Sequence, residues 1–94
     1  MSPLFAAEIH LWPTEAGGRA IPLPHDEWRT VLGIDGQYWS ARLLLSGTHA
    51  PGEIFRAQVQ LLFPEAIEHF PMGAKFSIWE GRAKGEGCVL STMI

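Results

Sequence analysis

Histidine and cysteine are the residue types of this sequence best suited to metal binding or nucleophilic catalysis. The chain of 94 residues contains four histidines and one cysteine, which are His10, His25, His49, His69 and Cys88. Zinc ligands normally occur in close pairs, such as Cys-x-x-Cys or two histidines about three to five residues apart. None of these residues has such a partner, and Cys88 lies in an apolar segment of strand length, where a cysteine is typically a small buried hydrophobe. We therefore expect no metal site, no cofactor and no cysteine nucleophile.

Two further patterns that could indicate an enzyme are the acidic residues and a glycine-rich stretch. The ten acidic residues are scattered, and no two have the spacing of a shared acid–base site. The segment 81–87 contains three glycines, but it lacks the Gly-Lys-Ser/Thr end of a P-loop and the Gly-x-Gly-x-x-Gly pattern of a dinucleotide site. A strand-like segment follows it, which is typical of a hairpin connection. The sequence predicts no enzyme.

Tryptophan is frequent for so short a chain. The four tryptophans are Trp12, Trp28, Trp39 and Trp79. Alternation places Trp12 and Trp79 on the outward faces of predicted strands. One interpretation is that they close the ends of the fold. The other is that they form an exposed patch for a partner, because tryptophan is enriched at the energetic centres of interfaces.

Alternating apolar and polar residues indicate that these side chains lie on strands. Apolar residues occupy the odd-numbered positions of Phe5–Trp12, and Glu53–Phe63 repeats this pattern from Phe55 onward. Four further runs have strand length and strand composition: Trp28–Ile34, Tyr38–Leu45, Lys75–Glu80 and Gly87–Met93. Glycine- and proline-containing turns separate the runs, and Pro64–His69 can hold one helical turn. Six strands predict an all-β fold, a sandwich or a small closed antiparallel β-barrel, and closure is favoured because it hides strand edges.

Composition and charge define the class of protein. With 47% hydrophobic residues and a net charge of −3, the sequence indicates one globular domain over residues 1–94 and not a disordered chain. Seven basic against ten acidic residues argue against a protein that binds nucleic acid over its whole surface. A single cysteine argues against a disulfide-stapled secreted fold, and no signal peptide or membrane span is evident. We therefore expect a cytoplasmic protein with no membrane partner.

Three segments of the chain form an ordered pattern. They are Phe5-x-Ala7-x-Ile9 followed by Glu15–Arg19 and Pro22, Pro51–Glu53 followed by Val59-x-Leu61-x-x-Pro64, and Phe76–Val89. Together they resemble the C-terminal β-barrel, domain III, of elongation factor Tu, over the range from Phe5 to about Thr92. The departures are one glycine before Arg82 where the family has two, Trp79 in place of an arginine, and no clear match over Pro24–Leu45.

The resemblance implies a six-stranded antiparallel barrel without a catalytic role. In elongation factor Tu this barrel follows a GTPase domain, contacts the T-stem backbone of aminoacyl-tRNA and offers a surface to the nucleotide-exchange factor. This chain has no GTPase domain, so we do not expect it to deliver tRNA at the expense of GTP. We expect a stand-alone binding module for RNA, such as tRNA, or for a translation-associated protein.

The expected RNA-binding residues lie in the connection before the last predicted strand. Arg82 and Lys84 would contact phosphates, and Gly85 and Gly87 would let the backbone approach RNA closely because they have no Cβ. The alternative hypothesis is a pure protein-interaction module, of an antagonist or immunity type, that binds no RNA. In that case Trp12 and Trp79 are the expected partner-binding residues.

Overall fold

Six β-strands and two short 3₁₀ helices form this computed structural model, which describes residues 4–17, 26–45, 47 and 49–93. The strands are β1 (Leu4–Leu11), β2 (Glu27–Ile34), β3 (Gln37–Leu44), β4 (Ile54–Leu61), β5 (Lys75–Trp79) and β6 (Ala83–Met93). The 3₁₀ helices are η1 (Thr14–Ala16) and η2 (Pro64–His69). The predicted all-β class is confirmed, as is the helical turn at Pro64–His69. None of the helices among the described residues combines the length and the hydrophobicity that a bilayer crossing requires.

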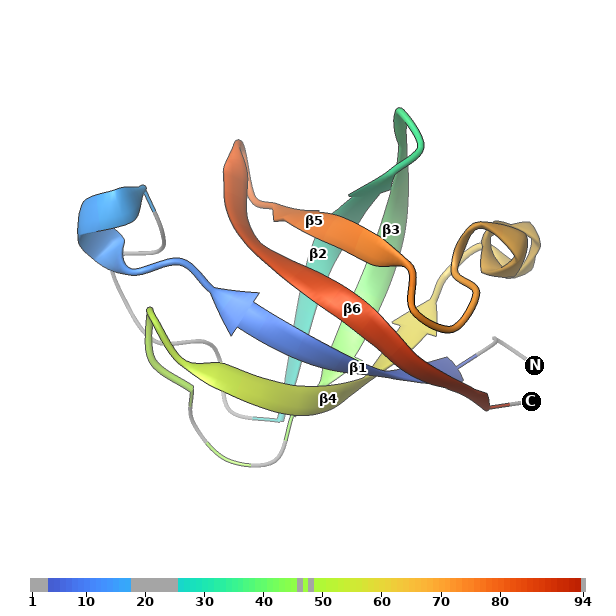
Figure 1. Cartoon of the computed structure of the whole chain (residues 1–94), viewed down its shortest axis with the longest axis horizontal. Coiled ribbons are helices and arrows are strands. Elements are labelled where there is room, and N and C mark those ends of the chain that lie inside the picture. The colour runs from blue at the N-terminus through green and yellow to red at the C-terminus, as the bar shows by residue number, and fades with distance from the viewer. Residues whose placement is uncertain (1–3, 18–25, 46, 48, 94) are drawn as a thin grey trace.

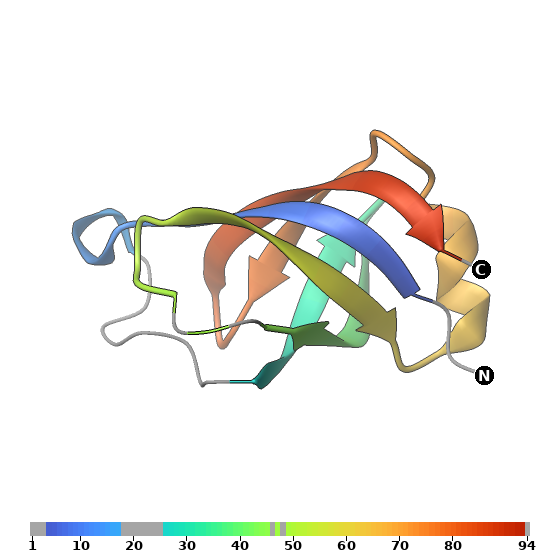
Figure 2. The same ribbon diagram turned by 90° about the horizontal axis from the view of Figure 1, so that it is seen from below.

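The strands close into one antiparallel barrel, as the sequence predicts. Their order is β1-β4-β3-β2-β5-β6, and β6 pairs with β1 to complete the circle. The β1–β6 pairing runs along the whole of β1, whereas β2 and β5 pair only over Val31–Gly33 and Ser77–Trp79. The helices η1 and η2 lie at opposite ends of the long axis of the barrel (Figures 1 and 2).

Side chains at alternate strand positions fill the interior of the barrel. Phe5, Ala7 and Ile9 of β1 have no exposed surface, and the residues between them face outward. The segment that follows η2 closes one end of the barrel, because Phe70 stacks on Phe5 with 5.2 Å between the ring centroids. Phe76 meets both rings edge-on. This aromatic cluster explains why a single short 3₁₀ helix is enough to cover that end.

The turn between β2 and β3 fixes the register of these two strands. Asp35 and Gly36 have φ angles of 53° and 75°, and a two-residue type I′ turn requires positive φ at both central positions. Ile34 and Gln37 pair directly across this turn. The pairing of every later residue of β3 with β2 follows from this turn.

The last strand begins earlier than the sequence predicts. β6 starts at Ala83 and not at Gly87, so Gly85 lies inside a strand. The turn before it is short, and the backbone N–H of Glu80 donates to the carbonyl oxygen of Arg82 over 2.9 Å. In the sequence Gly85 and Gly87 look like turn residues, but in the structure close packing within the barrel requires them.

Candidate binding surface

A group of outward-facing side chains crosses three neighbouring strands of the barrel. Ser77 and Trp79 of β5 alternate with buried residues and therefore face outward. Gly33 of β2 pairs with Ser77 on one side and with Tyr38 of β3 on the other. We call Gly33, Tyr38, Ser77 and Trp79 the aromatic patch.

The aromatic patch is held together by hydrogen bonds and ring contacts. The indole N–H of Trp79 donates to Ser77 Oγ over 2.7 Å, and the Ser77 hydroxyl donates to the carbonyl oxygen of Gly33 over 3.3 Å. The Tyr38 and Trp79 rings meet edge to face, with centroids 5.3 Å apart and an interplanar angle of 87°. A Cβ on Gly33 would lie only 2.6 Å from Ser77 Oγ and 2.8 Å from Trp79 Nε1. The side chains therefore converge on a position that only glycine leaves free.

The aromatic patch is accessible to a partner. Tyr38 is 60% exposed, which is high for so large a side chain, and Trp79 is half-buried. Next to it lies a depression of about 170 Å³, which we call the hairpin hollow. Its lining residues are Gly33, Ile34, Asp35, Gly36, Gln37, Tyr38 and Ser77.

Arg82 and Lys84 do not form an isolated basic site. Arg82 is exposed in the β5–β6 turn, and Lys84 is half-buried on β6. Exposed carboxylates at Glu80 and Glu86 flank them along the chain. Two positive and two negative charges in one short segment give little net attraction for phosphate.

The sequence-based reason for choosing Gly85 and Gly87 is wrong. Both glycines are buried. A Cβ on Gly85 would lie 2.6 Å from the carbonyl oxygen of His10, and a Cβ on Gly87 would overlap the ring of Phe76. The space that these glycines leave is filled by the protein's own β1 backbone and core and is not open to a ligand.

The two tryptophans predicted to bind a partner lie in different settings. Trp79 faces outward as predicted. Trp12 follows the last residue of β1 and so is not on a strand face, and its backbone N–H donates to the carbonyl oxygen of Lys84 over 3.0 Å. In the described part of the chain, Tyr38 is the ring partner of Trp79, and no ring contact involves Trp12.

The other two tryptophans have structural positions. Trp28 is 4% exposed, and its indole N–H donates to Glu80 over 3.4 Å. Trp39 stacks on His69 of η2 with 5.4 Å between the ring centroids. Trp39 therefore packs against η2, which lies at one end of the barrel.

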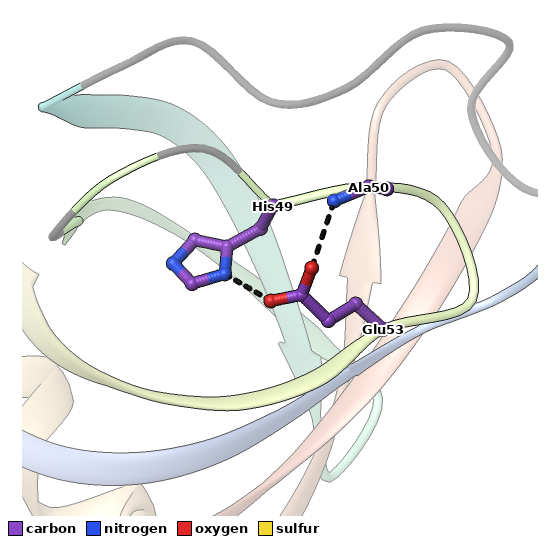
Figure 3. A network of polar contacts seen from close by, with 3 residues as sticks. All are labelled: His49, Ala50 and Glu53. Atoms are coloured by element: carbon purple, nitrogen blue, oxygen red, sulfur yellow. Dashed lines mark hydrogen bonds and ion pairs between the residues drawn. The ribbon is translucent and has the colours of Figure 1, made fainter.

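The loop between β3 and β4 contains a polar network that the sequence analysis did not identify (Figure 3). The His49 ring stacks on Phe55 with 3.8 Å between centroids, and its Nδ1–H donates to the Glu53 carboxylate. The backbone N–H of Ala50 donates to the other carboxylate oxygen over 3.2 Å. These bonds, first that from His49 and then that from Ala50, lower the pKa of Glu53 below its ordinary value of 4.5. The network holds the segment 49–53 in place, and its three residues include no nucleophile.

The remaining residues considered for metal or thiol chemistry are spread over the barrel. His10 Nδ1 lies 3.7 Å from Glu86, His69 Nδ1 lies 3.9 Å from Asp35, and His25 is outside the described residues. No three His, Cys, Asp or Glu side chains converge as metal ligands in residues 4–17, 26–45, 47 and 49–93. The prediction that Cys88 is a buried hydrophobe is wrong, because it is half-buried on the outer face of β6, between the inward-facing Gly87 and Val89.

Comparison with protein-family models and with curated proteins finds no match for this chain. Of the aromatic patch, the sequence singled out Trp79 alone. The structure shows that Gly33, Tyr38 and Ser77 lie beside it. The Asp35-Gly36 pair in the sequence could have indicated that Gly33 and Tyr38 are neighbours, since a two-residue hairpin places them opposite each other. No local signal indicates that β5 lies beside β2.

Proposed function

We propose that this protein is a non-enzymatic binding module that recognises a protein partner through the aromatic patch. The observation that supports it is the outward-facing pair of Tyr38 and Trp79, held in place by Ser77 over a bare Gly33. Tyrosine and tryptophan dominate the binding energy of interfaces, and a pre-organised pair loses little entropy on binding. The resemblance to elongation factor Tu supports a translation-associated, cytoplasmic protein as that partner.

Charge favours a protein partner over RNA. The chain has a net charge of −3, and Arg82 and Lys84 lie between Glu80 and Glu86 in the sequence. RNA affinity depends mainly on uncompensated positive charge, whereas recognition by aromatic side chains does not.

Affinity capture with purified protein as bait tests the proposal. Extract treated with RNase and untreated extract should give the same partner. Tyr38→Ala and Trp79→Ala should each weaken its retention about tenfold or more, as expected for central interface residues. Ile54→Ala is the matched control, because Ile54 on β4 is also 60% exposed and lies outside the aromatic patch.

Two results would contradict the proposal. Retention that disappears after RNase treatment would show that RNA mediates the contact. Equal retention by the Tyr38, Trp79 and Ile54 variants would show that the patch is not the binding surface.

A further inference from the structure

We propose that the surface beside the aromatic patch recognises an apolar side chain of the protein partner together with an acidic residue close to it. The apolar side chain enters a hollow on the outer face of β2 and β3, and the carboxylate pairs with Arg29. This inference rests on the proposed function and states the chemistry of the partner. We call this hollow the arginine hollow, and its lining residues are Arg29, Thr30, Val31, Ser40, Ala41 and Leu62.

The arginine hollow continues the aromatic patch across the sheet. Val31 of β2 pairs with Trp79 of β5 on one side and with Ser40 of β3 on the other. The chain just after β4 reaches the same row, because the backbone N–H of Leu62 donates to the carbonyl oxygen of Ser40 over 3.2 Å. Each of these four residues is next to a buried residue in the chain, so all four side chains face outward. A partner that covers the aromatic patch therefore meets the hollow as well.

The lining of the arginine hollow suits an apolar side chain. Val31, Ala41 and Leu62 supply hydrocarbon surface, and Leu62 is 38% exposed. The Thr30 hydroxyl already donates to the carbonyl oxygen of Trp79 over 2.8 Å. At about 270 Å³ the hollow is smaller than the cavities of about 300 Å³ or more that hold cofactors and drug-sized ligands. Removal of an apolar side chain of the partner from water would favour binding here.

Two arginines lie opposite each other at this hollow. Arg29 of β2 pairs directly with Arg42 of β3, and like charges in this relation repel each other. Arg42 has partners of its own, because its Nε lies 3.2 Å from the Glu27 carboxylate and its Nη1 donates to Gln60 over 3.4 Å. Arg29 is exposed, and in the described part of the chain no carboxylate lies within ion-pair distance of it.

The charge of this surface selects an anion. Among the described residues, Arg29 is the one charged residue in the lining of the hollow. A guanidinium donates two parallel hydrogen bonds to a carboxylate, and such charge-assisted bonds are stronger than neutral ones. One arginine is enough for one carboxylate of a protein, whereas RNA affinity needs several phosphate contacts. The complementary partner is therefore an acidic and apolar protein segment.

The spacing of the two features fits an extended segment. Arg29 and Val31 are two positions apart on one face of β2, and this spacing corresponds to about 6.6 Å along a strand. In an extended partner segment, an acidic residue and an apolar residue two positions later have the same separation and face the same side. The tripeptide Glu-Ala-Leu is a minimal segment of this kind.

Nuclear magnetic resonance titration of the whole protein with N-acetyl-Glu-Ala-Leu-amide at millimolar concentrations tests this inference. The peptide should shift the methyl signals of Val31 and Leu62, which Val31→Ala and Leu62→Ala variants assign. Two matched peptides separate the two contributions, one with glutamine in place of glutamate and one with alanine in place of leucine. Each should bind at least about fivefold more weakly, because the first lacks the charge and the second lacks the apolar side chain.

Variants of the protein locate the binding. Arg29→Gln should lower the affinity for the peptide about fivefold, and Leu62→Ala should lower it by a similar factor. Arg56→Gln, at an exposed arginine of β4 outside the arginine hollow, is the matched control and should leave the affinity unchanged. The same spectra show whether each variant is folded.

The inference is overturned if the peptide shifts neither methyl signal, if the glutamine peptide binds equally well, or if Arg29→Gln binds like the unmodified protein. It is also overturned if adenosine monophosphate shifts these methyl signals and the peptide does not, since the surface would then take a nucleotide. If the peptide fails while Tyr38→Ala and Trp79→Ala still lose the captured partner, only this inference falls. If those two variants keep the partner, the proposed function falls instead.

Discussion

At the scale of single residues, three glycines within strands determine how closely neighbouring groups pack. Gly33 leaves room on the outside for Ser77 and for the Trp79 indole, so it shapes the aromatic patch. Gly85 and Gly87 leave room on the inside, one for the β1 backbone and the other for the Phe76 ring. A methyl group added at a glycine should be tolerated better where it meets side-chain atoms than where it meets backbone atoms.

Gly85→Ala should destabilise the protein more than Gly33→Ala. At Gly85 the new methyl group meets the backbone of His10 and Leu11, which can move only if β1 moves. At Gly33 it meets the ends of side chains, which can rotate away at the expense of the patch. We expect a loss of about 2–3 kcal/mol for Gly85→Ala and about 1 kcal/mol or less for Gly33→Ala.

Thermal unfolding followed by circular dichroism measures this difference, because about 1 kcal/mol shifts the midpoint by about 4–8 °C in a domain of this size. Gly33→Ala should in addition change the tryptophan emission. Equal midpoints for the two variants would contradict the packing argument.

At the scale of elements, the segment 49–53 before β4 is held by its own side chains. The His49 ring lies flat on Phe55. Its ring N–H and the amide of Ala50 both donate to Glu53 (Figure 3). Gly52 joins the loop to the end of β1, since its N–H donates to the carbonyl oxygen of Leu11 over 3.0 Å. The backbone bond from Gly52 joins this segment to the barrel, and the bonds within the segment from His49 and Ala50 depend on the charge of the Glu53 carboxylate.

The contribution of Glu53 to stability should disappear in acid. Because the pKa of Glu53 is lower in the folded than in the unfolded state, the unfolded chain takes up the proton first as the pH falls. The stabilisation is complete above the ordinary value of 4.5 and is lost as the pH falls through the lower folded value. The difference in melting midpoint between the unmodified protein and Glu53→Gln should therefore shrink below that pH.

A His49→Ala background provides the control for this experiment. The hydrogen bond from His49 is the largest cause of the lowered pKa of Glu53, so without it Glu53→Gln should have a smaller and less pH-dependent effect. If the gap between the unmodified protein and Glu53→Gln stays constant into acid, the network does not stabilise the ionised carboxylate.

At the scale of the whole molecule, the sequence predicts the parts of the barrel that follow from local patterns. Alternation identified β1 and β4 nearly to their ends, but we predicted no strand register from the sequence, and the β2–β3 register set by the Asp35-Gly36 turn comes from the structure. The start of β6 was missed because glycines required by packing cannot be distinguished in the sequence from glycines required by a turn.

The candidate site could be predicted only in part, because it depends on contacts between distant segments. Alternation predicted that Trp79 faces outward, but its ring partner Tyr38 is far away in the chain. The two meet because β2 and β5 pair over a short stretch, which the closure of the barrel imposes and no local pattern indicates. The hairpin hollow forms at this same junction.

The overall charge leads to a last prediction, which concerns RNA. With a net charge of −3, and with Arg82 and Lys84 flanked by carboxylates, the protein should show no measurable binding to tRNA at about 150 mM salt. Any binding at lower salt should fall with a slope of log affinity against log salt no steeper than about −2, since two phosphate contacts contribute about that much. The double variant Arg82→Ala, Lys84→Ala should remove this weak binding at low salt, whereas Tyr38→Ala should leave the salt slope unchanged. Fluorescence anisotropy with labelled tRNA measures the affinity at about 150 mM salt, the salt slope and the effect of each variant. Tight binding at about 150 mM salt that the double variant abolishes would instead make RNA the ligand of this barrel, with the β5–β6 turn as its site.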